Sequence, residues 1–241
     1  MRHLRFAVIA LAVVLVAVGT GRARVSAQPA DGSPVVATFR GSPDASGLPY
    51  LGPVTLHAGL AVVRARHNGT GNFSVWLRLP EPGAAPNDDT HSLRSYLLIN
   101  TAGRFDGSAA TVVSNDGDYY ISGSANGAYE ITVEQPTPTT VHPVDPGTLN
   151  GANVQVSPAL ALRAGTYTIS THFTATVMRV YMYVIDDLGG GPFGTGYYGK
   201  ILDSSSDGPS VTIDVPQGGL YLLMIEPGGT GSERPWTLSI E

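Results

Sequence analysis

The sequence contains one long internal repeat, and this repeat constrains the fold more than any other feature. Each copy opens an apolar stretch on a glycine and closes on an aromatic residue that leads an alternating stretch. Gly59 and Tyr129 are 70 positions apart, and Gly165 and Trp236 are 71 apart. A unit of this length is a complete folded module, because solenoid repeats span only roughly 20–50 residues. The sequence therefore predicts two modules with the same fold.

Within each copy the apolar residues recur at every second position. This alternation covers residues 73–79, 179–184 and 211–215. Alternation over several residues indicates a half-buried strand, and the 30 Gly and 18 Pro leave no room for an ordinary helix after the leader. We expect an all-β protein of two tandem antiparallel β-sandwich (jelly-roll-like) domains, at residues 35–136 and 149–241. The Pro/Thr-rich residues 137–148 are expected to form a stiff, extended linker.

Residues 1–27 have the pattern of a secretory signal peptide. Arg2, His3 and Arg5 precede an apolar stretch of 13 residues, Phe6–Val18, and the small residues Val25-Ser26-Ala27 form a cleavage site before Gln28. A membrane-spanning helix needs about 20 apolar residues, so the leader is too short to be an anchor. We expect a secreted, extracellular protein that keeps no membrane segment after cleavage.

The mature chain is acidic and contains no cysteine. Four of the 14 basic residues lie in the leader, so 10 basic residues remain against 19 acidic ones, a net charge of −9. Nucleic acids and anionic membranes both require a basic surface, so neither is an expected partner. Without disulfides, each module has to be stabilised by its apolar core.

No catalytic motif is present. The sequence has no Gly-x-Ser-x-Gly elbow, no His-Glu-x-x-His and no phosphate-binding loop. His67 and His172 fall at corresponding positions of the repeat, which favours a structural role, since catalysis normally uses one asymmetric group of residues. We therefore expect a protein that is not an enzyme.

Three aromatic residues are predicted to point away from the core. Trp76 lies between Val75 and Leu77, and Tyr181 and Tyr183 flank Met182. Two interpretations remain open: the modules bury these faces against each other, or the rings form a platform on which sugars stack.

The long segment 186–200 is the other candidate for ligand contact. It is rich in glycine and contains Phe193, Tyr197 and Tyr198. Loops of this length are uncommon and often functional. We expect these three aromatic residues to contact a ligand, if the loop is not simply irregular.

Acidic turns are candidate calcium ligands. The residues in question are Asp88, Asp89, Asp116, Asp118, Asp186 and Asp187. Calcium takes six to eight oxygen ligands, often from flexible turns. Asp also starts turns through hydrogen bonds to its own backbone, which is an alternative reason for its presence.

The first copy resembles a known but poorly characterised module. The stretches Ala58–Val63, His67–Gly69, Asn72–Leu77, Leu97–Asn100 and Gly127–Val133 are similar to a secreted bacterial and archaeal β-sandwich module. The second copy shares the closing Trp236 but not the Asn-Phe stretch. In layout both are similar to the jelly-roll-like accessory domains of secreted bacterial proteases, a resemblance that implies an extracellular accessory role and no catalytic residues.

Together these features predict a secreted, non-catalytic binding or accessory protein. The expected partner is an extracellular polysaccharide or protein, and carbohydrate binding is the leading specific version. The alternative is a calcium-stabilised structural protein of a cell surface.

Overall fold

The computed structural model describes residues 34–41, 48–85, 92–185, 197–228 and 234–241, and its regular elements are all strands. The signal peptide prediction lies outside these residues. The first module contains β1 (Val35–Gly41), β2 (Leu48–Leu56), β3 (Gly59–His67), β4 (Asn72–Pro80), β5 (Ser92–Ala102), β6 (Phe105–Val113), β7 (Gly117–Ser124) and β8 (Tyr129–Glu134). The second contains β9 (Thr148–Ala152), β10 (Gln155–Val156), β11 (Leu160–Leu162), β12 (Gly165–Phe173), β13 (Val177–Ile185), β14 (Tyr197–Ser204), β15 (Ser210–Val215), β16 (Gly219–Gly228) and β17 (Pro235–Ile240). No helix that could cross a membrane occurs within the described ranges.

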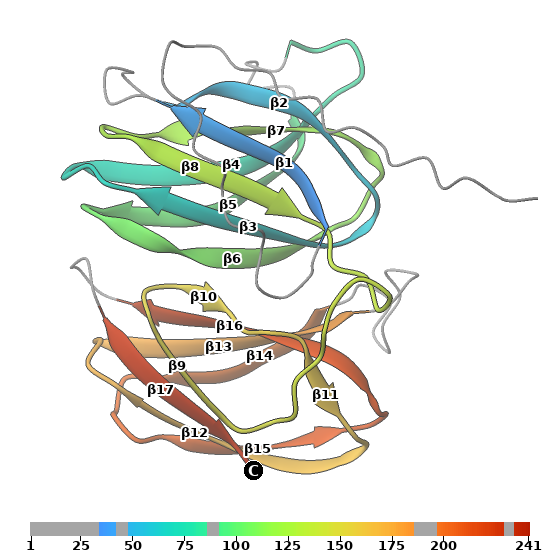
Figure 1. Cartoon of the computed structure of the whole chain (residues 1–241), viewed down its shortest axis with the longest axis vertical. Coiled ribbons are helices and arrows are strands. Elements are labelled where there is room, and N and C mark those ends of the chain that lie inside the picture. Colours follow the sequence, from blue (N-terminus) through green and yellow to red (C-terminus); the bar gives the residue numbers. More distant parts are fainter. Residues whose placement is uncertain (1–33, 42–47, 86–91, 186–196, 229–233) are drawn as a thin grey trace, which may run out of the picture.

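Each module is a sandwich of two antiparallel sheets (Figure 1). In the first module the sheets have the strand orders β1-β8-β3-β6 and β2-β7-β4-β5. In the second the orders are β9-β17-β12-β15 and β10-β16-β13-β14, with β11 also pairing with β16. The two modules therefore share one topology, with β10 and β11 in the place of β2. The prediction of an all-β fold built from antiparallel sandwiches is confirmed.

The alternation read from the sequence matches the burial along the strands. In β4, Phe73, Val75 and Leu77 are completely buried, and the residues between them are only partly buried. Successive side chains of a strand point to opposite faces, so one face of β4 enters the core and the other is available for contacts outside the module. Each module has its own apolar core, between its two sheets.

A buried tyrosine closes each module in the same way. The hydroxyl of Tyr119 donates to the carbonyl of Asn115 at 2.9 Å, and that of Tyr221 donates to the carbonyl of Gln217 at 2.8 Å. Both tyrosines are fully buried. In each case the acceptor is four residues upstream, at the turn that enters the strand, which is the geometry of a tyrosine corner.

The predicted equivalence of His67 and His172 is off by one residue. His67 pairs with Tyr129, whereas the residue that pairs with Trp236 is Phe173. A shift of one position moves a side chain to the other face of a sheet. His67 is accordingly 3% exposed, stacked on Phe73 with ring centres 4.5 Å apart, and its Nδ1 lies 2.9 Å from the Gly103 carbonyl oxygen. His172 instead faces solvent beside Asp207.

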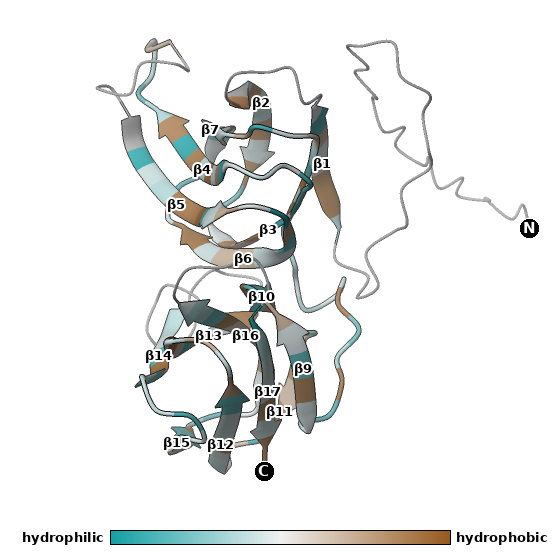
Figure 2. Cartoon of the chain, turned by 90° about the vertical axis from the view of Figure 1, so that its left-hand side faces the viewer, coloured by the Kyte–Doolittle hydropathy of each residue, from teal (hydrophilic) through white to brown (hydrophobic). Residues whose placement is uncertain are grey.

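The two modules stack face to face (Figures 1 and 2). The outer face of the β1-β8-β3-β6 sheet packs on the outer face of the β10-β16-β13-β14 sheet. The contact is apolar, and its buried residues are Leu60, Val62, Ala110, Val141, Val156, Ala159, Tyr183, Ile185 and Leu222. We call this set the interface cluster. It buries the face of Tyr181 and Tyr183, for which the sequence had left open a sugar platform or a contact between modules, but not the face of Trp76.

The second module also covers the free edge of β6. The Ser108 N–H donates to the Val154 carbonyl at 2.9 Å, and the Val156 N–H donates to Ser108 Oγ at 2.8 Å. Further along β6, the Ala110 N–H points to the sulfur of Met224, and the Ala110 carbonyl accepts the hydroxyl of Tyr183 at 3.2 Å. An exposed edge strand is a site for unwanted pairing, and here the neighbouring module satisfies its backbone groups.

The segment 137–148 packs on the modules and is not a free spacer. Val141 is buried in the interface cluster, and Val144 forms a parallel bridge with Leu160. Thr137 and Thr140 close a turn through a backbone hydrogen bond of 3.0 Å. The segment therefore begins with a turn and is anchored to the modules further along, and its stiffness stays a prediction.

The sheet face of the first module that packs on the second module is apolar, whereas the corresponding face of the second module is polar. Gly59 pairs with Val113 and Gly165 pairs with Val215, which aligns the two copies residue by residue. With this alignment, the docking residues Leu60, Val62, Ala110 and Val112 correspond to Thr166, Thr168, Thr212 and Asp214. Within the part of the chain that the structure describes, this contact is therefore made once, and the matching face of the second module is exposed or partly exposed.

Candidate functional site

The outer face of the β2-β7-β4-β5 sheet carries an exposed aromatic residue of the predicted platform. Trp76 is partly exposed and pairs with Leu97 on one side and Ser122 on the other. Leu97 is 45% exposed, and Tyr120 lies next to Trp76 diagonally, where it pairs with Arg78. We call these four residues, Trp76, Arg78, Leu97 and Tyr120, the outer patch. It lies on the face of the first module opposite to the docking contact.

Arg78 supports the indole of Trp76. The centre of the guanidinium lies 5.3 Å from the ring centre, within the range of a cation–π contact. This contact orients the ring and brings N–H donors next to it. A sugar stacked on Trp76 would share the ring with the guanidinium or displace it, and its hydroxyls would then lie within reach of these donors.

Trp76 and Tyr120 belong to none of the apolar clusters of the described residues, whereas their counterparts in the second module pack at the contact between modules. Trp76 pairs with Ser122 in the first module, and Tyr181 pairs with Met224 at the corresponding position of the second. Trp76 is therefore the counterpart of Tyr181, and Arg78, two residues further on, is the counterpart of Tyr183. In the second module this face is covered by the first module. In the first module, polar residues replace two of the residues of this face: Arg78 stands in the place of Tyr183, and Ser122 in the place of Met224.

Tyr183 does not belong to an exposed platform, which corrects the prediction. Its side chain is 5% exposed, its hydroxyl is bound to Ala110, and burial raises its pKa well above the usual range. Tyr181 is partly buried against the interface cluster, and burial together with the Glu226 carboxylate raises its pKa to about 12. The alternative in which the modules bury their outer faces holds for these two tyrosines.

Two of the aromatic residues predicted to contact a ligand at the long loop, Tyr197 and Tyr198, lie in different surroundings. Tyr197 is 37% exposed, and its ring centre lies 5.5 Å from that of Tyr183, at the border of the module contact. Tyr198 turns inward, packs edge-on against Tyr221 and donates its hydroxyl to the Asp214 carbonyl. Phe193 lies outside the described residues. A shared binding role for these three residues stays a prediction.

Asp116 and Asp118 are engaged in hydrogen bonds with the protein. Asp116 Oδ1 accepts the Ala58 N–H at 2.7 Å, and this bond, helped by His57, lowers the pKa of Asp116. Asp118 accepts the Thr55 hydroxyl at 2.6 Å. These bonds fasten the turn between β2 and β3 and the pairing of β2 with β7.

No group of three or more His, Cys, Asp or Glu side chains that could hold a metal occurs among the residues that the structure describes. Asp88, Asp89, Asp186 and Asp187 lie outside these residues. Calcium binding by the acidic turns stays a prediction.

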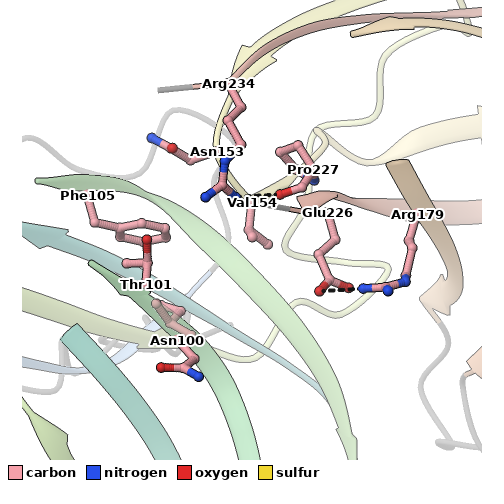
Figure 3. Close-up of a pocket in the computed structure, with 11 residues that line it drawn as sticks. Asn100, Thr101, Phe105, Asn153, Val154, Arg179, Glu226, Pro227 and Arg234 are labelled. Atoms are coloured by element: carbon pink, nitrogen blue, oxygen red, sulfur yellow. Dashed lines mark hydrogen bonds and ion pairs between the residues drawn. The ribbon is translucent and has the colours of Figure 1, made fainter. Parts of the chain in front are cut away.

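A cleft of about 220 Å³ opens where the two modules part, beside the interface cluster (Figure 3). The first module contributes Asn100, Thr101 and Phe105, and the second contributes Asn153, Arg179 and Glu226. Sequence reasoning missed this cleft, because its residues come from both copies of the repeat and the modules had to be placed before they met.

The charged groups of the cleft are paired. Arg179 Nη1 lies 3.4 Å from Glu226 Oε1, and Arg179 Nε lies 3.7 Å from Asp203 Oδ1. At the other end of the cleft, Arg234 donates to the Pro227 carbonyl at 2.9 Å. Burial lowers the pKa of Arg234, although a guanidinium stays charged at neutral pH.

One wall of the cleft is held in an unusual backbone conformation. Asn153 has φ +61°, the single positive φ outside glycine among the described residues. Its carbonyl accepts the indole N–H of Trp236 at 2.9 Å, and the next carbonyl, that of Val154, accepts the Ser108 N–H. Both modules therefore fix this turn.

No known protein family and no characterised protein matches the sequence. Among solved structures the chain is similar to the exported protein XepA of PBSX, with 10% identity over 87% of this chain and 84% of that one, at a TM-score of 0.24.

It is also similar to the tandem CBM22 domains of Xyn10C from Paenibacillus barcinonensis, with 6% identity over 89% and 99% of the two chains and a TM-score of 0.27. A third similar structure is the glycoside hydrolase domain of Endo-D from Streptococcus pneumoniae, with 14% identity over 84% of this chain but 33% of that one, at a TM-score of 0.26. TM-scores of this size carry no detail of architecture or function, so the β-sandwich fold rests on the chain's own sheets.

Proposed function

We propose that the chain is a secreted, non-catalytic binding protein that holds an extracellular polysaccharide on the outer patch. One observation carries this proposal. Trp76 and Tyr120 are aromatic on a sheet face that also carries polar neighbours such as Ser122 and Arg78, and no sheet of the described residues packs on this face. Surface aromatic residues without a packing role are typical of recognition sites.

The chemistry of the outer patch suits a sugar chain. A flat indole offers an apolar surface to the C–H face of a pyranose, and Arg78 supplies hydrogen-bond donors beside it. Tyr120 and Leu97 continue the surface on the neighbouring strands, so that an extended chain could lie across β7, β4 and β5. A β-sheet face of this kind is rigid, so little conformational entropy is lost on binding.

The test is retention of residues 28–241 on a panel of soluble and insoluble polysaccharides. We expect Trp76→Ala to weaken retention at least tenfold, about the loss that follows truncation of a central aromatic contact, while Trp76→Phe keeps part of it. Thr168→Ala, on the opposite end of the stack, serves as the matched control and should bind as the unmodified chain does.

Thermal unfolding of the same variants separates binding from folding. Because Trp76 is partly exposed and lies outside the core, Trp76→Ala should melt within a few degrees of the unmodified chain. If Trp76→Ala melts far lower, or if it retains every polysaccharide that the unmodified chain retains, the proposal is wrong.

A protein partner is the second candidate, and the repeat favours it for a specific reason. The corresponding face of the second module, around Tyr181 and Leu222, already docks a β-sandwich. The outer patch could therefore receive another such module. Loss of binding to a partner protein in Trp76→Ala, with no polysaccharide retained by the unmodified chain, would select this candidate.

A further inference from the structure

We propose that the cleft between the two modules is a second binding site, which takes a single neutral sugar ring. It shares no residue with the outer patch, so it stands or falls independently of Trp76. The proposal starts from the charges of the cleft. Arg179 and Glu226 face each other across neighbouring strands, and their side chains are 36% and 33% exposed, so solvent and small ligands reach both groups.

Glu226 also accepts a hydrogen bond from the Tyr181 hydroxyl, but a carboxylate offers about four acceptor positions, so both Arg179 and Glu226 keep spare hydrogen-bonding capacity. Their contact of 3.4 Å, and the 3.7 Å contact of Arg179 with Asp203, are longer than the roughly 2.7–2.9 Å of a fully formed charge-assisted hydrogen bond. A guanidinium presents parallel N–H donors and a carboxylate presents two acceptor oxygens. Adjacent hydroxyls of a sugar ring match both patterns, since each hydroxyl can donate and accept.

The balance of charge selects an uncharged ligand. The cleft is lined by two cations, Arg179 and Arg234, and by the Glu226 carboxylate. The Asp203 carboxylate pairs with Arg179 beside it, so two positive charges face two negative ones. An anionic ligand would compete with the carboxylates for Arg179, and a cation would compete with Arg179 for Glu226. A neutral, hydroxyl-rich ligand can instead bridge the pair without leaving either charge alone. Asn100 and Thr101 add amide and hydroxyl groups from the first module, and Phe105 adds an apolar ring.

The size and the rigidity of the cleft also favour a single sugar ring as the ligand. Its volume of about 220 Å³ is below the roughly 300–1,000 Å³ of sites for drug-sized ligands, which suits one ring and not an oligosaccharide. The wall at Asn153 is fixed by Trp236 from one side and through Val154 by Ser108 from the other. A preorganised wall reduces the ordering that a ligand would otherwise impose, and a residue in a rarely occupied backbone conformation is typical of such sites.

The chain supplies two separate reporters for the two sites. It has two tryptophans, and thus two indole N–H signals in a ¹⁵N–¹H spectrum. The Trp76 signal reports on the outer patch. The Trp236 signal reports on the cleft, because its N–H is bound to Asn153 in the cleft wall. The spectrum of Trp76→Phe assigns them.

The experiment is a titration of the ¹⁵N-labelled chain 28–241 with D-glucose, D-xylose, D-galactose, N-acetyl-D-glucosamine and D-glucuronate. Each is added to about 100 mM, which saturates a site whose Kd is on the order of 1–10 mM. We expect at least one of the neutral sugars to shift the Trp236 signal and the amides of Asn100 and Thr101 in a saturable way, in the unmodified chain and in Trp76→Ala alike. Glu226→Gln should weaken this binding roughly tenfold, because a charged acceptor becomes neutral. Asn100→Ala, a change at an exposed position, should also weaken it.

Three results would overturn the proposal. The first is the absence of shifts at the cleft signals with every sugar at the highest concentration. The second is unchanged binding in both Glu226→Gln and Asn100→Ala. The third is tighter binding of D-glucuronate than of D-glucose, which would contradict a neutral ligand. Loss of polysaccharide retention in Trp76→Ala with an intact cleft titration would support both sites, so failure of one site can be told from failure of the other.

Discussion

The contact between the modules should be a major source of stability, and Tyr183 allows this to be measured. Its ring is 5% exposed within the interface cluster, and its hydroxyl is bound to the Ala110 carbonyl at 3.2 Å. Replacing a buried aromatic residue with alanine costs about 3–5 kcal/mol, because apolar burial is lost and a cavity remains. We therefore expect Tyr183→Ala to lower the free energy of unfolding by about 4 kcal/mol.

Urea unfolding followed by circular dichroism measures this loss. With an m-value of about 2–3 kcal/mol/M, a change of about 4 kcal/mol moves the midpoint by about 1.3–2 M. Arg78→Ala is the matched control, since Arg78 occupies the position of Tyr183 in the first module but belongs to no apolar cluster of the described residues. It should move the midpoint very little. A shift in Tyr183→Ala as small as that of Arg78→Ala would mean that the modules do not stabilise each other through this contact.

Three further predictions concern pH, surface chemistry and calcium. Burial raises the pKa of Tyr119 and Tyr181 to about 12. Their contribution to stability is complete below the unfolded pKa of about 10 and is lost as the pH rises from 10 towards 12. The melting temperature should therefore fall between about pH 10 and 12 and be level between about pH 7 and 9. Replacing Thr166 with Leu and Thr168 with Val copies the β3 part of the docking face onto β12 of the second module and should cause self-association in sedimentation velocity, whereas a sedimentation coefficient equal to that of the unmodified chain would contradict this. Asp116→Ala should lower the melting temperature by the same amount in calcium and in chelator, because Asp116 holds the Ala58 N–H; a loss seen only in calcium would show that this carboxylate binds the metal.

The strands could be predicted from the sequence because their burial repeats at every second residue. Phe73, Val75 and Leu77 enter the core as the alternation requires, and the 70-residue repeat corresponds to one shared strand order. Alternation states which residues share a face, but not what covers it. Tyr183 and Trp76 therefore looked alike in sequence, although one is buried between modules and the other borders solvent.

The error at His67 and His172 has a similar physical origin. Aligning the copies on their histidines gave an offset that differs by one from the offset of the opening glycines. In a sheet that single position moves the side chain from the core to solvent, and only the pairing of Phe173 with Trp236 decides between the two offsets. The cleft was beyond prediction for a different reason, since Asn100 and Glu226 belong to different copies and meet only through the docking contact.

The unequal faces of the two modules make the tandem directional. A duplicated domain is often pictured as an exchangeable unit, yet here the first copy presents Leu60 and Val62 where the second presents Thr166 and Thr168. Expressed alone, the first copy would expose an apolar sheet face and the bare edge of β6. Joined in the reverse order, the two copies would bring threonines against the face that carries Trp76. The divergence of a few outward-facing positions has thus turned two copies of one fold into a single unit with a fixed order.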